Sequence, residues 1–348
     1  MTRINTYQVL GIMVLLLKLD CLGANSVPQL SELLEKYTQS LDSTASMISS
    51  YKSSTISSAY LPPMNLNYTN VRMYDKGERR TDGKGRIYHQ SYVWGFHTVL
   101  QKDVPESKAS YALQVATSHF QYGHNKVTRG QSNGLVTYKE TQSPGWNNFR
   151  NNSDAFFLGY LGVDVRIDVI LKKAKQISVR SEPAIMNGDL CYVIQAETAY
   201  GDYVLWLDSA YGYQPIRIEA TKDGDDIVNV AALQGSPDKR PEARERLVID
   251  DLTFKQVQEV WIPVKGRVKS RIQWPRHGYY FNNDIRYEIT QIKLNPDHDA
   301  LKSFADPIKH PGVDPELVND TRVRLGEKGL LCVWRDGKLV DNAGDLPN

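Results

Sequence analysis

The chain has 348 residues, with 42 Lys and Arg against 40 Asp and Glu, and a formal net charge of +2. This length is enough for one large or two ordinary domains with a substantial core. The even charge excludes a typical nucleic-acid-binding protein, which carries a basic excess or a basic stripe.

The first 24 residues have the pattern of a signal peptide. Arg3 precedes the apolar run 9–17, which is too short to span a bilayer, and small residues follow at positions 23 and 24. We expect residues 1–24 to be removed and the mature protein to be periplasmic or secreted. A lipid anchor would use Cys21, but the charged residues just before it do not suit that signal.

Residues 26–54 have the pattern of one amphipathic helix with a polar reverse face. The Ser/Thr-rich stretch that follows ends at Pro62-Pro63, which is a natural break. The helix is expected to cover a neighbouring sheet. Its apolar residues recur at helical spacing and are Leu30, Leu33, Leu34, Tyr37, Leu41, Met47, Ile48 and Tyr51.

From residue 65 onward the apolar pattern has a period of two, which is typical of strands. We predict about ten to twelve strands joined by short Gly, Asn and Asp turns, and such turns favour antiparallel neighbours. The basic cluster 76–86 is interpreted as a solvated hairpin tip rather than a phosphate-binding patch. Residues 164–173 are compatible with a short helix, and 227–235 with a strand.

The stretch from Cys191 to Ala220 alternates over three strands, with turns at Gly201-Asp202 and Gly212. One face of these strands is apolar, and the other mixes aromatic with charged residues. A large antiparallel sheet usually covers its apolar face, and the leading helix provides that cover. The predicted fold class is therefore mainly β with α, a large curved antiparallel sheet under one or two helices.

Residues 187–220, NGDLCYVIQAETAYGDYVLWLDSAYGYQPIRIEA, carry a family resemblance. Their strand, turn and strand order resembles the middle of outer-membrane lipoprotein-sorting proteins of the LolA/LolB-like superfamily. GRIYHQSYVWG, at 85–95, resembles the earlier strand pair of these periplasmic carriers, and the leading helix stands where theirs does. The resemblance covers residues 28–295 and depends on order and spacing, not on a short motif.

The resemblance implies a half-barrel at 25–297 whose helices form a lid over the concave side, followed by a C-terminal appendage with a small hairpin at 298–348. It implies that acyl chains of a lipid or acylated lipoprotein lie between lid and sheet, each buried methylene contributing about 0.8 kcal/mol. The resemblance is also compatible with peripheral contact with a membrane. A further partner could be an envelope protein. The family's lid-fastening arginine has three candidates: Arg72, Arg86 and Arg217.

Ten apolar residues are the predicted pocket wall, and the alternative for each is that it only fills the core. Seven lie on predicted strands and three on the leading helix. They are Leu190, Tyr192, Ile194, Leu205, Leu207, Ile216 and Ile218, with Leu34, Leu41 and Ile48 from the helix.

The sequence gives little support for catalysis. The pairs His119/His124 and His89/His97 lack metal-site spacing, and the chain has no G-x-S-x-G or P-loop motif. We therefore predict no cofactor, no metal and no catalytic residues. Two alternatives remain for Cys191 and Cys332: they are two buried free thiols, or they form a disulfide.

Three interpretations remain open at this point. The first is an exported carrier or sensor of acyl chains, and the second is an envelope module that binds a polypeptide or senses stress. The third, a secreted enzyme, would require a cluster of His and carboxylate groups in a cleft.

Overall fold

The computed structural model describes the greater part of the chain. The predicted signal peptide, with Cys21, and the predicted strand at 227–235 lie outside the described residues. The described ranges are 27–98, 101–117, 120–126, 132–138, 158–161, 165–186, 188–224, 226, 242–306, 321–325, 331–335 and 338–340.

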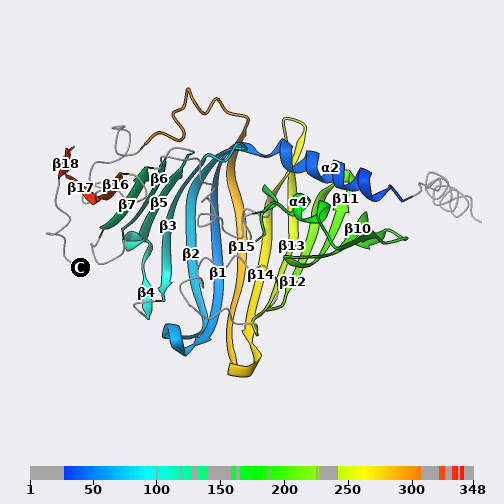
Figure 1. Ribbon diagram of the computed structural model, residues 1–348, viewed down its shortest axis with the longest axis horizontal. Helices are drawn as coiled ribbons and strands as arrows, with labels where there is room; N and C mark the ends of the chain where they lie inside the picture. The colour runs from blue at the N-terminus through cyan, green and yellow to red at the C-terminus, as the bar shows by residue number, and fades with distance from the viewer. Residues whose placement is uncertain are drawn as a thin grey trace, which may run out of the picture.

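In the described ranges, 18 strands form one sheet, more than the sequence pattern predicts (Figure 1). In the order in which they pair, they are β18 (Lys338–Val340), β17 (Leu331–Arg335), β16 (Thr321–Leu325), β7 (Ser132–Tyr138), β6 (Phe120–Lys126), β5 (Ser110–Ala116), β3 (Ile87–His97), β2 (Leu66–Asp82), β1 (Ser46–Leu61), β15 (Tyr279–Leu294), β14 (Val260–Trp274), β13 (Arg244–Val257), β12 (Gln214–Lys222), β11 (Gly201–Asp208) and β10 (Asp189–Thr198). The short strands β8 (Gln176–Val179) and β9 (Ala184–Met186) both pair with β10, and β4 (Lys102–Val104) pairs with β3.

The sheet is antiparallel at every described pairing except one, between β7 and β16, which run parallel. It is open and not closed into a barrel. The strands β10 to β15 follow one another both in the chain and in the sheet. Short turns join all of these neighbours except β12 and β13, which are separated by residues 223–243. The predicted fold class is confirmed.

Two helices, α2 (Leu30–Ser43) and α4 (Ile167–Lys172), lie over the β10–β14 end of the sheet (Figure 1). The short helix expected at 164–173 is thus confirmed, with tighter bounds. In the part of the chain that the structure describes, four 3-10 turns connect other elements: Pro62–Met64, Glu106–Lys108, Ser209–Tyr211 and Pro275–His277.

The leading helix is shorter than its apolar pattern predicts, and this part of the prediction is wrong. It ends at Ser43, and β1 begins at Ser46. Met47, Ser49 and Tyr51 are all buried, which is the period of a strand, and the many hydroxyl side chains of this segment disfavour a helix interior. β1 pairs with β2 on one side and β15 on the other, so backbone bonding on both edges outweighs the helical spacing.

The basic cluster at 76–86 lies at the end of the β2–β3 hairpin, but only part of it forms the tip. β2 continues to Asp82, only residues 83–86 form the turn, and Arg79 is buried inside the sheet. The turn between β10 and β11 is formed by Ala199 and Tyr200, two residues before the predicted position, because Gly201 and Asp202 already belong to β11. The φ of Gly201 is +108°, and a Cβ there would lie 2.4 Å from the carbonyl oxygen of Thr221, so a side chain would be excluded.

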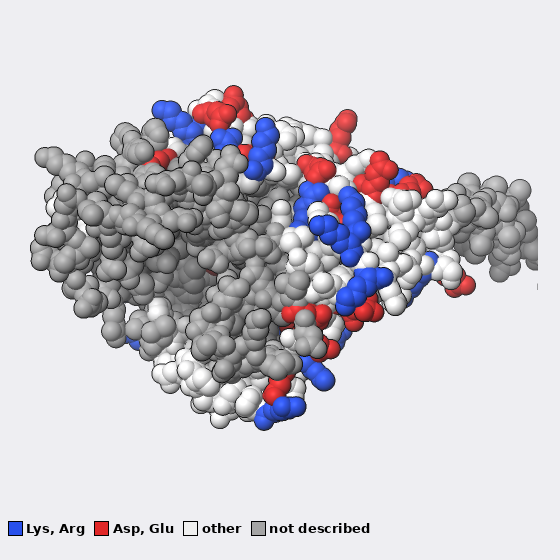
Figure 2. All heavy atoms as spheres, viewed as in Figure 1, with Lys and Arg blue, Asp and Glu red and all other residues white. Residues whose placement is uncertain are grey.

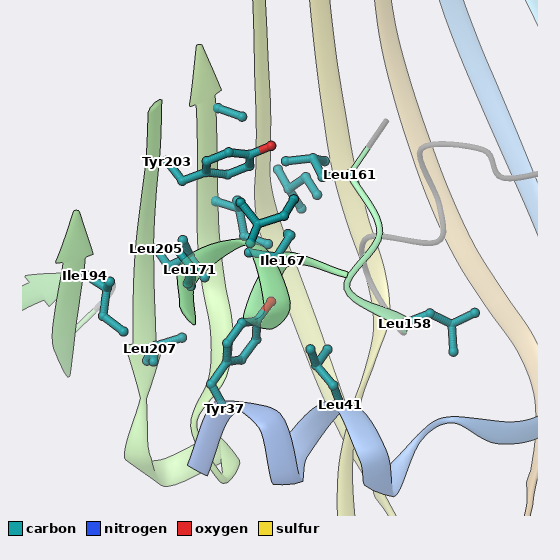
Figure 3. Packing of buried hydrophobic residues seen from close by; sticks show 14 of the residues in the cluster. Tyr37, Leu41, Leu158, Leu161, Ile167, Leu171, Ile194, Tyr203, Leu205 and Leu207 are labelled. Carbon is teal, nitrogen blue, oxygen red and sulfur yellow. The ribbon is translucent and has the colours of Figure 1, made fainter. Parts of the chain in front are cut away.

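The core lies between the two helices and the face of the sheet toward them, which we call the inner face. Along each strand, every second residue points to this face. Figure 3 shows α2 and α4 contributing side chains that meet those of the strands. The most deeply buried members of the cluster include Leu33, Tyr37, Leu41, Ile167, Ile170, Ile194, Leu205, Leu207, Ile218 and Ile249.

The C-terminal segment continues the main sheet. β16 joins the sheet beside β7, and β17 and β18 extend it further. Before them, residues 297–305 turn back onto the β2–β3 hairpin, where Arg86 bonds Asp299 at 2.8 Å and its guanidinium lies 4.8 Å from the ring centroid of Phe304. The domain boundary at 298 remains a prediction.

Candidate functional site

The helix-covered interface contains seven of the ten residues predicted to line a pocket. All seven are buried and belong to one apolar cluster between the sheet and its covering helices. Figure 3 labels four of them: Leu41, Ile194, Leu205 and Leu207. Leu205, Leu207 and Ile194 have no exposed surface at all, so side chains fill the interface around them. The seven are Leu34, Leu41, Tyr192, Ile194, Leu205, Leu207 and Ile218.

The other three predicted residues lie elsewhere. Ile48 was expected on the helix, but it lies in β1, one residue from the buried Met47 and so on the other face of the sheet. Ile216 is buried in β12 beside a register shift. Leu190 is 40% exposed on β10, near the edge of the sheet.

Leu190 belongs to an apolar lip, which we define as Leu190 and its cross-strand partner Ile185 on β9. Ile185 is 78% exposed. Alternation along β10 places Leu190 on the same face as the buried Tyr192. Apolar surface therefore continues from the covered core to solvent at this end of the sheet.

Lys36, on the covering helix α2, lies at the same end of the sheet as the apolar lip. The Lys36 ammonium of α2 donates to the Tyr213 hydroxyl at 3.0 Å and lies 4.5 Å from the centroid of the Tyr213 ring. That ring stacks on Tyr192. Lys36 also pairs with Glu32 at 2.7 Å, and these contacts raise the pKa of Lys36, the Glu32 hydrogen bond most strongly.

The far end of α2 is fastened by an ion network. Arg166, just before α4, binds Asp42 of α2 at 2.6 Å and Asp168 of α4 at 2.6 Å. Asp168 also accepts a hydrogen bond from Thr38 of α2 at 3.1 Å, and Lys172 donates to Thr38 at 3.0 Å. We call these five residues the lid clamp, because they join the two covering helices to each other.

The charge state of the clamp follows from its geometry. Burial alone would raise the pKa of Asp168, whose side chain is 1% exposed. The hydrogen bonds and charge of Arg166, with smaller contributions from Thr38 and Lys172, outweigh burial and lower this pKa below its ordinary value. Arg166 and Asp168 therefore form a charged pair at neutral pH.

None of the three candidate arginines fastens the helices. Arg72 is exposed, and Arg86 holds the turn at 297–305. Arg217 bonds Glu219 and lies 5.4 Å from the ring centroid of Trp206, on the face of the sheet away from the helices. Sequence reasoning missed Arg166, although the pair Arg166-x-Asp168 beside the predicted short helix was a usable signal.

A buried polar cluster lies on the inner face near β1–β3. The Tyr51 hydroxyl donates to Asp75 at 3.0 Å and lies 2.7 Å from Nε2 of His89. Burial raises the pKa of Asp75 to about 6, against the Tyr51 hydrogen bond, and burial with the nearby Arg79 lowers the pKa of His89 to about 4. The cluster thus holds a neutral imidazole at physiological pH.

We expect an Asp75→Asn variant to be more stable than the parent at neutral pH. The folded-state pKa of Asp75 lies above its unfolded value, so ionisation costs stability as pH rises from about 4 to 6. The difference between the two proteins should grow from near zero at pH 4 to about 3 kcal/mol at pH 7. Urea unfolding at both pH values measures it, and a difference independent of pH would contradict this assignment.

The opposite face of the sheet carries two adjoining hollows of about 590 and 700 Å³, which we call the outer trough. Arg267 lines one hollow and Asp284 the other, and their hydrogen bond of 2.7 Å joins the two. Polar and charged side chains dominate the lining, together with the stacked rings of Tyr74 and Trp94. Sequence reasoning did not find this trough.

The helix side of the molecule has mixed charge. Figure 2 shows acidic and basic side chains next to one another on the described part of that view. No helix in the described residues is long and apolar enough to cross a membrane.

The described residues contain no group of three or more His, Cys, Asp and Glu side chains that could hold a metal ion. His119 and the side chain of His124 lie outside the described residues, and His89 is bonded to Tyr51. Cys191 is a buried free thiol on β10, far in the strand order from Cys332 on β17. Burial raises its pKa to about 11, so it stays protonated.

The fold belongs to the class of large open antiparallel sheets, here covered on one face by the helices α2 and α4. No protein-family model matches the chain, and no curated protein matches it. Among solved structures, it is similar to the Pseudomonas aeruginosa MucA/MucB complex at 7% identity and a TM-score of 0.24, covering 76% of this chain and 99% of that one. A structure of lipid–protein interactions in lipovitellin is similar at 10% identity and a TM-score of 0.29, covering 72% of this chain and 26% of that one.

Proposed function

We propose that this chain is a binding protein that holds acyl chains of a lipid or lipid-modified protein between its sheet and the two covering helices. The observation that carries the proposal is the unbroken apolar surface from the buried cluster to the exposed lip, Ile185 and Leu190. In the conformation described, side chains fill this space. Binding therefore requires α2 to move away from the sheet.

The distribution of polar contacts supports such a movement. At the lip end, α2 is held by the surface contact of Lys36 with Tyr213. Further along, the carbonyl of Ser40 accepts from the Gln214 side chain at 3.3 Å, and the clamp of Arg166 and Asp168 holds the last turn. The helix is thus fastened more weakly where the apolar surface reaches solvent, and acyl chains enter there.

The proposal also gives Lys36 a role. An ammonium at the mouth of an apolar site attracts the phosphate or carboxylate of an amphiphile, while the hydrocarbon lies inside. Glu32 and the Tyr213 hydroxyl hold Lys36 in place until such a group arrives.

The first experiment is organic extraction of the protein, purified without detergent from its native source, followed by mass spectrometry. A stoichiometric lipid or acylated peptide is the expected result. An empty extract from well-folded protein contradicts the proposal.

The lip provides a test that leaves the core intact. An Ile185→Glu/Leu190→Glu variant places charge on exposed positions, so it should fold normally but bind a fluorescent long-chain fatty acid at least about tenfold more weakly, because each buried methylene contributes about 0.8 kcal/mol. The matched control is Val340→Glu, whose side chain is 41% exposed on β18, far from the lid. Equal affinity in all three proteins would show that the lip is not the entrance.

The compartment and the chemistry remain part of the proposal. We propose that residues 1–24 direct export of the chain and that the mature protein is periplasmic or secreted. We also expect it to have no catalytic role. The polypeptide-binding alternative is favoured by one observation, the charged outer trough, which lies on the face away from the helices.

A further inference from the structure

The outer trough contains a ladder of cations along one strand. Lys265, Arg267, Lys269 and Arg271 alternate with small or apolar residues in β14, and they point to the same face. Alternate side chains on one face of a strand are about 6.6 Å apart. The ladder therefore places four basic side chains in a row about 20 Å long. Three of them also pair with carboxylates of the sheet: Lys265 with Glu288, Arg267 with Asp284, and Lys269 with Asp250.

The trough as a whole is positively charged. Nine Lys and Arg residues line the two hollows against six Asp and Glu residues, although the chain is close to neutral. One of these carboxylates, Asp75, bonds Tyr51 on the inner face and does not offset the cations here. A surface of this kind attracts an anionic partner.

Two features of the trough are costly for the protein alone. Arg286 lies directly opposite Arg267 on the neighbouring strand, and like charges in that position destabilise a sheet. Among the described residues, the side chains of Arg286 and Arg271 form no ion pair, although the charge of Arg286 contributes to the lowered pKa of Asp284. Oδ1 of Asn282 and Oδ1 of Asp250 are buried without a hydrogen-bond donor among the described groups. A ligand that carries carboxylates would relieve the first feature, the repulsion between Arg267 and Arg286.

We propose that the outer trough binds an extended acidic polypeptide segment along β14, with carboxylates at alternate positions facing the cation ladder. An extended chain places alternate side chains about 6.6 Å apart, the same spacing as the ladder. The stacked rings of Tyr74 and Trp94 provide an apolar platform at one end. This site lies on the opposite face from the acyl site and does not depend on it.

The test uses the full chain and fluorescein-labelled peptides in anisotropy titrations. The first peptide has twelve residues with Glu and Thr in alternation, and the second has the same composition with the six Glu in one block. We expect the alternating peptide to bind more tightly, and binding to weaken as salt is raised. Equal affinity for the two peptides would contradict the proposal that carboxylates at alternate positions match the spacing of the cation ladder.

The variant Arg271→Gln/Arg286→Gln removes two cations that make no ion pair with a described residue, so folding should be preserved. We expect about a tenfold loss of affinity for the alternating peptide, from two charges contributing up to about 1 kcal/mol each. The control is Lys293→Gln, an exposed lysine on the same strand as Arg286 that lines neither hollow. An equal loss of affinity in the control would mean that only the net charge of the protein matters. That result would contradict a binding site in the outer trough.

Two further measurements distinguish a polypeptide site from a general anion site and from the acyl site. Dextran sulfate that binds the trough while both peptides fail would overturn the polypeptide assignment in favour of an anionic glycan. The lip variant Ile185→Glu/Leu190→Glu should bind the alternating peptide like the parent. Failure of the acyl-binding test with intact peptide binding therefore leaves this inference standing, and the converse also holds.

Discussion

An Asp168→Ala variant should lose about 3 kcal/mol of its free energy of unfolding, because it leaves Arg166 without its main partner. The Asp168 side chain is 1% exposed and the Arg166 side chain 21% exposed, so this pair is shielded from solvent. The Thr38 hydroxyl keeps the Leu34 carbonyl as an acceptor but loses its contact with α4, so the link between the two covering helices is weakened. Urea unfolding with linear extrapolation measures the change.

The clamp offers its own control. Asp42 binds the same guanidinium at 2.6 Å but is 60% exposed, so Asp42→Ala should cost less than about 1 kcal/mol. The effect of Asp168→Ala should also depend on pH. Since the folded-state pKa of Asp168 is below its unfolded value, its stabilisation is present above about pH 4 and lost as pH falls below that. Equal losses for both variants would contradict the account of a buried clamp.

A Leu205→Ala variant should lose about 3 kcal/mol, since a fully buried leucine leaves both lost transfer energy and a cavity. Leu190→Ala, on the neighbouring strand and 40% exposed, should lose less than about 1 kcal/mol. The difference between the two losses of stability distinguishes a core residue from a lip residue among the ten predicted pocket residues. Thermal or urea unfolding of both variants measures it.

The same variant tests whether hydrocarbon enters this region. A long-chain fatty acid that binds only the folded state raises the free energy of unfolding with its concentration. We expect it to stabilise the parent, and Leu205→Ala more strongly, because the cavity accepts part of the chain. A fatty acid that shifts neither unfolding midpoint would contradict acyl binding between helices and sheet.

Strand alternation was readable from the sequence because it is a local property. The period of two in residues 187–220 predicted β10, β11 and β12, and their apolar face is the face that the helices cover. The same alternation selected Ile194, Leu205 and Leu207 as inward-facing residues. It could not separate a pocket wall from a filled core, because both require the same residue types.

The error over Met47 to Tyr51 has a different cause. Their spacing fits a helix and a strand equally well, and only pairing with β2 and β15 decides between them. β15 lies more than 200 residues further along the chain, so no local pattern contains this information. The lid clamp was missed for the same reason, since Arg166 meets Asp42 across 124 positions.

Side-chain alternation and turn residues act locally, so the class of fold, the antiparallel meander and the face that a helix would cover could all be predicted from the sequence. The extent of the leading helix, the clamp between the two helices and the trough on the opposite face could not. These features depend on strands and helices that are distant in the chain and meet only when the sheet is assembled. Lys269 and Asp284 carry no local signal in the sequence, and they line one trough because β14 and β15 pair in a single register.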